Sequence, residues 1–162
     1  MNDCYQKTSH LELKGEGGRE FERRNPDKSW VNFILFMAEL NASFKRIDLA
    51  IDDFKGDAVT LGFLQEKILK RQYTSVFRSY PTPHGYLDSG LTLQFGTTES
   101  PIQLVIYDKF KERSKRKKET DKTYWVRYEM RFRNQTADRF ALTLIQELKA
   151  DKSLQTVYVN LS

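Results

Sequence analysis

Ile102-Gln103-Leu104-Val105-Ile106-Tyr107-Asp108-Lys109 is the segment from which the fold of this chain can be worked out. β-Branched and aromatic residues dominate it and apolar residues recur at every second position, which predicts a β-strand. Alternate side chains of a strand point to opposite faces, so its even-numbered Ile and Leu residues share one face and Tyr107 and Lys109 share the other. The apolar face predicts a core beneath the strand. The second face pairs a candidate nucleophile with a candidate phosphate-binding group.

A lone tyrosine on an amphipathic strand is most often an ordinary surface residue, so the neighbouring strands decide how Tyr107 is interpreted. Residues 44–54 also alternate and place Arg46, Asp48 and Asp52 on one face of a predicted strand. Two carboxylates on one face repel each other and lose hydration when buried, so a positive charge should compensate them. A divalent cation, Mg²⁺ or Mn²⁺, takes oxygen ligands and is one candidate. A solvated edge strand with acidic side chains is an equally good interpretation of this segment alone.

The predicted strand 124–133 places Arg127, Glu129 and Arg131 on one face. Before it lies the densest basic segment of the chain, which contains Lys111, Arg113, Lys115, Arg116, Lys117 and Lys118. Such a segment is usually a solvated loop. Because it follows the strand that carries Tyr107, it is also a candidate for sequence-independent contact with a phosphate backbone.

The remaining patterns predict helices and strands that complete one sheet. Predicted helices cover residues 30–40, 58–70 (with Asp57 as the N-cap) and 136–150; predicted extended segments cover 9–14, 19–23, 73–77, 91–95 and 154–161; and 81–85 is a predicted loop in which His84 is exposed. Together they predict an α+β fold of one domain, residues 1–162. In this fold an antiparallel sheet has helices packed on one face and a polar, catalytic face on the other.

Composition narrows the class of protein and of partner. The chain has 162 residues, with 30% charged and 13% aromatic residues, which suits a folded domain and argues against disorder. The formal net charge of +5 favours an anionic partner but is too small to identify nucleic acid by itself. The single cysteine, Cys4, cannot form an internal disulfide, and no apolar run is long enough to span a bilayer. A cytoplasmic protein without a membrane partner fits best.

Five segments occur in an order that resembles the rolling-circle replication initiators of Gram-positive plasmids and the related relaxases of integrative and conjugative elements. They are Leu11-Glu12-Leu13-Lys14-Gly15-Glu16-Gly17, Arg46-Ile47-Asp48-Leu49-Ala50-Ile51-Asp52-Asp53, Leu91 to Gly96, Ile106-Tyr107-Asp108-Lys109 and Arg127-Tyr128-Glu129-Met130-Arg131. The resemblance covers residues 11–148. Its most specific parts are the arginine-isoleucine-aspartate strand and the tyrosine-aspartate-lysine strand.

The resemblance implies a metal-dependent endonuclease that nicks one DNA strand at an origin and stays attached through a 5′-phosphotyrosine. It leaves a free 3′-hydroxyl for a polymerase. Tyr107 matches the nucleophile, with Lys109 as the cation beside it, and Asp48, Asp52 and Glu129 match acidic positions that we assign to Mg²⁺ or Mn²⁺. The DNA-binding residues would then be Arg46, Lys111, Arg113, Lys115, Arg116, Lys117, Lys118, Arg127 and Arg131. The expected partners are single-stranded or melted origin DNA, with a helicase and a polymerase as further candidates and a homodimer as a candidate assembly.

Two departures from the family pattern qualify these expectations. Family members are typically about twice this length, so the chain is expected to be a truncated or short form that lacks origin-recognition or dimer contacts. A histidine-hydrophobe-histidine motif is absent from the sequence, so carboxylates would have to hold the cation. Two alternatives stay open at this point. One is a non-catalytic DNA-binding domain that grips phosphates with the basic loop, and the other is an assembly domain that uses its sheet face for protein contacts.

Overall fold

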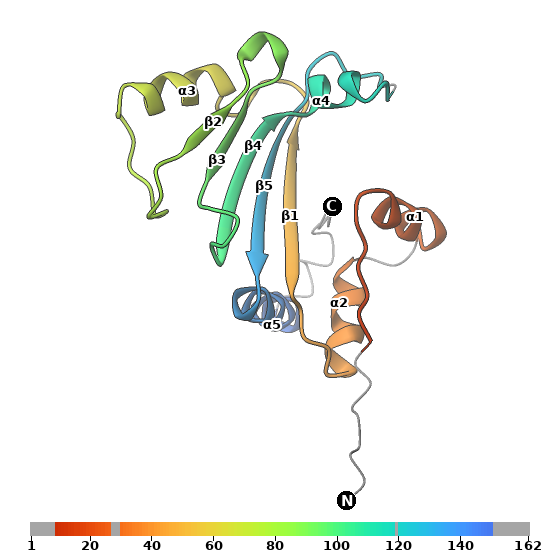
Figure 1. The fold of residues 1–162 in the computed structure, drawn as a ribbon. Helices are drawn as coiled ribbons and strands as arrows, with labels where there is room; N and C mark the ends of the chain where they lie inside the picture. The colour runs from red at the N-terminus through yellow and green to blue at the C-terminus, as the bar shows by residue number, and fades with distance from the viewer. Residues whose placement is uncertain (1–8, 27–29, 119, 151–162) are drawn as a thin grey trace, which may run out of the picture.

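The computed structural model describes residues 9–26, 30–118 and 120–150, which contain one antiparallel five-stranded sheet in the order β1-β5-β4-β3-β2 (Figure 1). The strands are β1 (Arg46–Asp53), β2 (Thr82–His84), β3 (Thr92–Phe95), β4 (Ile102–Asp108) and β5 (Val126–Arg133). The helices are α1 (Glu16–Arg24), α2 (Trp30–Glu39), α3 (Leu61–Leu69), α4 (Lys109–Lys115) and α5 (Gln135–Ala150), with a short 3₁₀ helix η1 (Leu87–Ser89). The predicted α+β class is therefore confirmed.

The helices α2, α3 and α5 cover one face of the sheet. Ile106 of β4 and Val126 of β5 pack in one apolar cluster with residues of α3, including Ile68. Ile47 of β1 packs in a second cluster with residues of α2 and α5, among them Ile34. All three strand residues project from the same side, because directly opposite residues of antiparallel strands share a face. The core therefore forms beneath the apolar face that the sequence predicts, and Tyr107 projects from the other face.

The two extended segments predicted at 9–14 and 19–23, which could have paired as a hairpin, are wrong. Residues 9–14 form no strand, and the predicted second extended piece is part of helix α1. Gly15 adopts a φ of +38° where the chain turns into this helix, a conformation that favours glycine. Within the helix Glu20 pairs with Arg23 and Arg24, at the spacing that places side chains on one helical face. Phe21 packs on Trp30 with ring centroids 4.6 Å apart, so a tertiary contact also favours the helix.

Other boundaries differ from prediction for local reasons. Helix α3 begins at Leu61 with Thr60 as its N-cap, not with Asp57. Residues 73–77 form no strand, whereas 82–84, predicted as a loop, form the edge strand β2, where a proline is tolerated. The basic segment starts as helix α4 instead of a loop, because Asp108 caps it by accepting a hydrogen bond from the Lys111 N–H at 2.8 Å.

The alternation in residues 44–54 predicts that Ile51 shares the buried face with Ile47. Ile51 is instead 66% exposed, because β1 is an edge strand and this position extends past the two helices packed near Ile47. Cys4, the segment 154–161 and the side chain of Leu148 lie outside the described residues. Within the described ranges, no helix combines the length and the apolar character that crossing a bilayer requires.

Candidate functional site

Cross-strand register gathers the predicted site residues on the face opposite the helices. Tyr107 of β4 lies directly opposite Arg127 of β5, which lies directly opposite Asp52 of β1. Two residues along β5, Glu129 follows on the same face, flanked by Val105 and Ala50. The next row consists of Gln103, Arg131 and Asp48. Strands far apart in sequence thus bring a phenol, three carboxylates and two guanidinium groups to one surface.

The phenol of Tyr107 lies between an acceptor and a cation. Its Oη donates a hydrogen bond to Oε2 of Glu129 at 3.3 Å, and Nζ of Lys109 donates to the same Oη at 3.4 Å. Lys109 also pairs with Glu112 at 2.7 Å, which holds the ammonium against the tyrosine ring, 5.4 Å from its centroid. Although Lys109 begins helix α4 and is not part of the strand, it stays within reach of the phenol as predicted.

The surroundings of Tyr107 stabilise the protonated phenol. Burial raises its pKa well above the ordinary value near 10, and the negative charge of Glu129 raises it further, while Arg127 lowers it by less. The cations beside Tyr107 therefore do not stabilise the phenolate enough to offset burial and the charge of Glu129. A reaction at this oxygen requires a base to take the proton as the bond forms, and Glu129 is in hydrogen-bond contact with it.

Each predicted carboxylate is compensated by an arginine. Asp52 accepts two hydrogen bonds of 2.7 Å from Arg127 and a third of 2.7 Å from Nε1 of Trp125. Asp48, 5% exposed, accepts two hydrogen bonds from Arg46. Glu129, 4% exposed, accepts one of 2.6 Å from Nε of Arg131. The compensating positive charge that the sequence requires is thus present as guanidinium groups from β1 and β5.

The three carboxylates do not fit one metal ion as a set. Asp48 and Asp52 are separated by four residues of β1, about 13 Å at the rise of a strand, so one ion cannot bind both. Glu129 lies between their rows and could share an ion with only one of them. In the part of the chain that the structure describes, no group of three or more metal-binding side chains is found. The prediction that Asp48, Asp52 and Glu129 bind one metal ion together is therefore corrected: at most Glu129 and one aspartate could share an ion.

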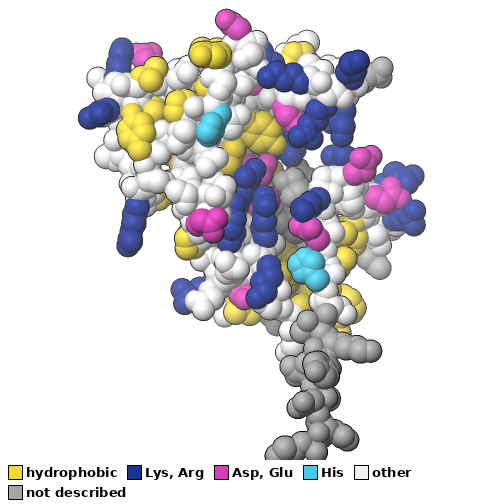
Figure 2. Space-filling view, in the orientation of Figure 1, with side chains coloured by type: hydrophobic (Ala, Val, Ile, Leu, Met, Phe, Trp, Pro, Cys, Tyr) yellow, Lys and Arg dark blue, Asp and Glu magenta, His cyan; other side chains and the backbone are white. Residues whose placement is uncertain are grey.

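The basic residues fall into two groups on the same side of the molecule. Arg46, Arg127 and Arg131 lie among the carboxylates of the open sheet face, where Lys and Arg side chains gather over β4, β5 and β1 (Figure 2). The others belong to α4 and the turn after it, at the end of β4 next to Tyr107. Of these, Lys115, Arg116, Lys117 and Lys118 are exposed, whereas Lys111 contacts the backbone oxygen of Leu87 and Arg113 lies 5.5 Å from the ring centroid of Trp125.

Sequence reasoning missed three contributors to this surface. His84 lies opposite Thr92, which lies opposite Tyr107, so the histidine shares the row of the phenol and is not a loop residue. Flanking prolines and glycine obscured the strand alternation that would have indicated this. Trp125 holds Asp52, and Gln103 is fully buried and accepts hydrogen bonds from Arg131 and Arg133. Trp125 and Gln103 alternate in step with the predicted site residues of their own segments, and this shared face was the signal that could have identified them.

Comparisons with known proteins identify relatives of this chain. The model of the replication initiation factor family matches residues 42–161. The chain is 31% identical, over 137 residues, to a Bacillus subtilis (strain 168) protein named "Putative DNA relaxase NicK", and the match covers 78% of this chain and 38% of that protein. The solved structure of a rolling circle replication initiator protein from Geobacillus stearothermophilus matches with a TM-score of 0.63 and 26% identity, over 83% of this chain and 50% of that one. The chain thus spans half of these relatives or less.

Proposed function

This chain belongs to the replication initiation factor family, and on that premise we propose that it nicks one strand of DNA with Tyr107 as the nucleophile. The observation that carries the proposal is the phenol held between Glu129 and Lys109 on a sheet face lined with arginines. The names of the Bacillus and Geobacillus relatives, a DNA relaxase and a rolling circle replication initiator, support the same kind of reaction. The proposed substrate is single-stranded or melted origin DNA.

In the proposed reaction Tyr107 Oη attacks the phosphorus of a phosphodiester while Glu129 accepts the phenolic proton. A bond forms between the tyrosine oxygen and phosphorus, and the bond between phosphorus and the 3′-oxygen breaks. The upstream strand leaves with that oxygen, which takes a proton from solvent, and the downstream strand stays on Tyr107 through its 5′-phosphate. Lys109 and Arg127 neutralise the charge that develops on the phosphate. Because one phosphate ester is exchanged for another, the number of ester bonds does not change, and the free 3′-hydroxyl can attack the phosphotyrosine to rejoin the strand.

The family resemblance also implies Mg²⁺ or Mn²⁺, which would polarise a phosphoryl oxygen when bound. Glu129 with one of the two aspartates would supply oxygen ligands, but in the structure each of these carboxylates is bound by an arginine. We therefore derive no step of the reaction through a metal. The roles assigned to Tyr107, Glu129 and Lys109 depend on hydrogen bonds of the chain itself.

Glu129→Gln is expected to lower nicking about 10²- to 10³-fold at neutral pH, because it removes the proposed base and keeps the side-chain shape. It also removes the negative charge that raises the pKa of Tyr107, so this pKa falls and phenolate forms at lower pH. The variant should therefore recover part of its activity as pH rises toward 10. Nicking rates measured from pH 7 to 10 on both proteins check this, with circular dichroism to confirm folding. Equal rates at every pH would exclude Glu129 as the base.

A non-catalytic DNA-binding domain is the second candidate function, because Lys115, Lys117 and Lys118 project exposed beside the sheet face. Replacing all three by Gln is expected to reduce the slope of log Kd against log salt by up to about 2, since each phosphate that a cation neutralises on a single strand adds roughly 0.7 to that slope. The matched control replaces the exposed Lys14, Lys55 and Lys70, which removes the same charge elsewhere. Equal slopes for both variants would exclude the basic segment as a phosphate-binding element. Binding without any covalent adduct would favour this second function over nicking.

A further inference from the structure

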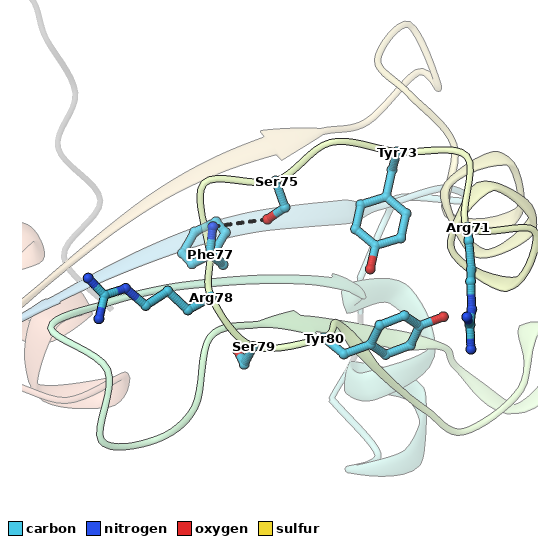
Figure 3. A pocket seen from close by; sticks show the side chains of 7 residues that line it. All are labelled: Arg71, Tyr73, Ser75, Phe77, Arg78, Ser79 and Tyr80. Atoms are coloured by element: carbon cyan, nitrogen blue, oxygen red, sulfur yellow. Dashed lines mark hydrogen bonds between the residues drawn. The ribbon is translucent and has the colours of Figure 1, made fainter.

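A groove unrelated to the predicted site lies in the segment between α3 and β2. Its volume is about 510 Å³, and it is lined by Arg71, Tyr73, Ser75, Phe77, Arg78, Ser79 and Tyr80. The segment runs out through Tyr73 and Ser75, turns at Phe77 and Arg78 and returns through Ser79 and Tyr80. The rings of Tyr73 and Tyr80 approach each other from the two limbs with Arg71 beside Tyr80, while Arg78 extends away at the turn (Figure 3). All of its lining comes from residues 71–80, which form neither helix nor strand.

The groove is on the helix-covered side of the sheet. Phe77 packs on Phe95 of β3 with ring centroids 6.1 Å apart, and Phe95 lies opposite Leu104 of β4. Leu104 and Tyr107 have opposite parity on β4, so they point to opposite faces. Tyr73 packs against the same apolar cluster as Leu104. The groove is therefore separate from the surface that carries the phenol, and the proposed nicking reaction does not use it.

The chemistry of the lining combines aromatic rings with cations. Tyr80 is 55% exposed, lies 6.1 Å from the ring of Tyr73 and is held by a hydrogen bond from its Oη to the backbone oxygen of Ile68 at 3.0 Å. Arg71 and Arg78 are exposed, and neither forms an ion pair with another described residue. Exposed rings beside guanidinium groups are the combination with which proteins stack bases and bind the phosphates of single strands.

We propose that this groove binds one nucleotide of single-stranded DNA, an inference that rests on the proposed function for its choice of ligand. The base stacks on Tyr80, and the exposed side chains of Arg71 and Arg78 bind phosphates on either side of it. On this side only β3 and β2 lie between β4 and the sheet edge, about 10 Å of sheet. A single strand leaving Tyr107 can therefore pass over β2 and reach the groove. A double helix, whose bases face each other, offers no free base for stacking there.

The test measures binding of fluorescein-labelled oligothymidylate by anisotropy, with the full chain and no nicking required. Arg71→Gln with Arg78→Gln is expected to weaken binding and to reduce the slope of log Kd against log salt by about 1.4, or 0.7 for each of two phosphates. The matched control, Arg19→Gln with Arg139→Gln, removes equal charge from exposed helical positions. Equal loss of slope in the two double variants would overturn the proposal.

Stacking is tested at Tyr80 with a conservative pair of variants. Tyr80→Leu is expected to weaken oligothymidylate binding at least about fivefold, whereas Tyr80→Phe keeps the ring and should bind like the unchanged chain. Equal affinity of the leucine variant would overturn the groove as a base-binding site. Oligothymidylate binding does not depend on the chemistry of Tyr107. If even the unchanged chain forms no covalent adduct, while the groove variants weaken oligothymidylate binding as expected, the proposed nicking function is refuted and this inference stands.

Discussion

Tyr107→Phe is expected to abolish covalent attachment to DNA and to reduce nicking on the order of 10⁴-fold or more, because the proposed phosphotyrosine bond forms through the oxygen that this substitution removes. The substitution removes one oxygen and keeps the ring that packs beside Lys109. Its hydrogen bond to Glu129 is lost, but Glu129 stays paired with Arg131 at 2.6 Å. We therefore expect the variant to fold normally and to retain DNA binding.

The measurement uses a random pool of single-stranded oligonucleotides labelled at the 3′ end, since the proposed bond joins the protein to the 5′-phosphate of the downstream fragment. Labelled protein that survives boiling in detergent reports the adduct. Tyr128→Phe is the matched control, because Tyr128 projects from the opposite face of the same sheet and bonds to the backbone oxygen of Val59. This control should label normally. Labelling that persists in Tyr107→Phe would assign the nucleophile to another residue.

The sheet could be predicted because the alternation of polar and apolar residues is a local property of each strand. The predicted strands around Ile47, Leu93, Ile106 and Val126 all occur, and they bury the predicted face. Helix α1 and strand β2 were missed because glycines lie at the start of the first segment and prolines in and before the second, and contacts from distant residues decide their structure. One such contact is the packing of Phe21 on Trp30.

The chemical state of the site could be predicted only in part. Parity places Tyr107, Glu129 and the two aspartates on one face, and the register confirms that shared face. Parity does not specify which cation compensates a carboxylate, so the pairing of Asp52 with Arg127 could not be distinguished from a metal site. The raised pKa of Tyr107 depends on how far neighbouring elements bury the phenol, and the residue pattern of one strand gives no information about this burial.

Arg127→Met is expected to destabilise the fold by about 3–5 kcal/mol, because it leaves the carboxylate of Asp52 buried without its charge partner. The two side chains of this pair are 13% and 11% exposed, and two hydrogen bonds of 2.7 Å join them. Trp125 would be left as the only described side chain that donates to Asp52. Urea unfolding measures the loss as a lower midpoint with an unchanged slope.

Two further variants separate the loss of the ion pair from a general effect of the substitution. Asp52→Asn in the Arg127→Met background removes the uncompensated charge, so the double variant should regain at least about 1 kcal/mol over Arg127→Met alone. Lys70→Met breaks the exposed pair with Glu66 and should cost less than about 1 kcal/mol. If Arg127→Met costs no more than Lys70→Met, water must reach Asp52 and the pair is not a buried one. The carboxylate would then be open to other cations, and the metal site that the sequence predicts near Tyr107 would regain a ligand.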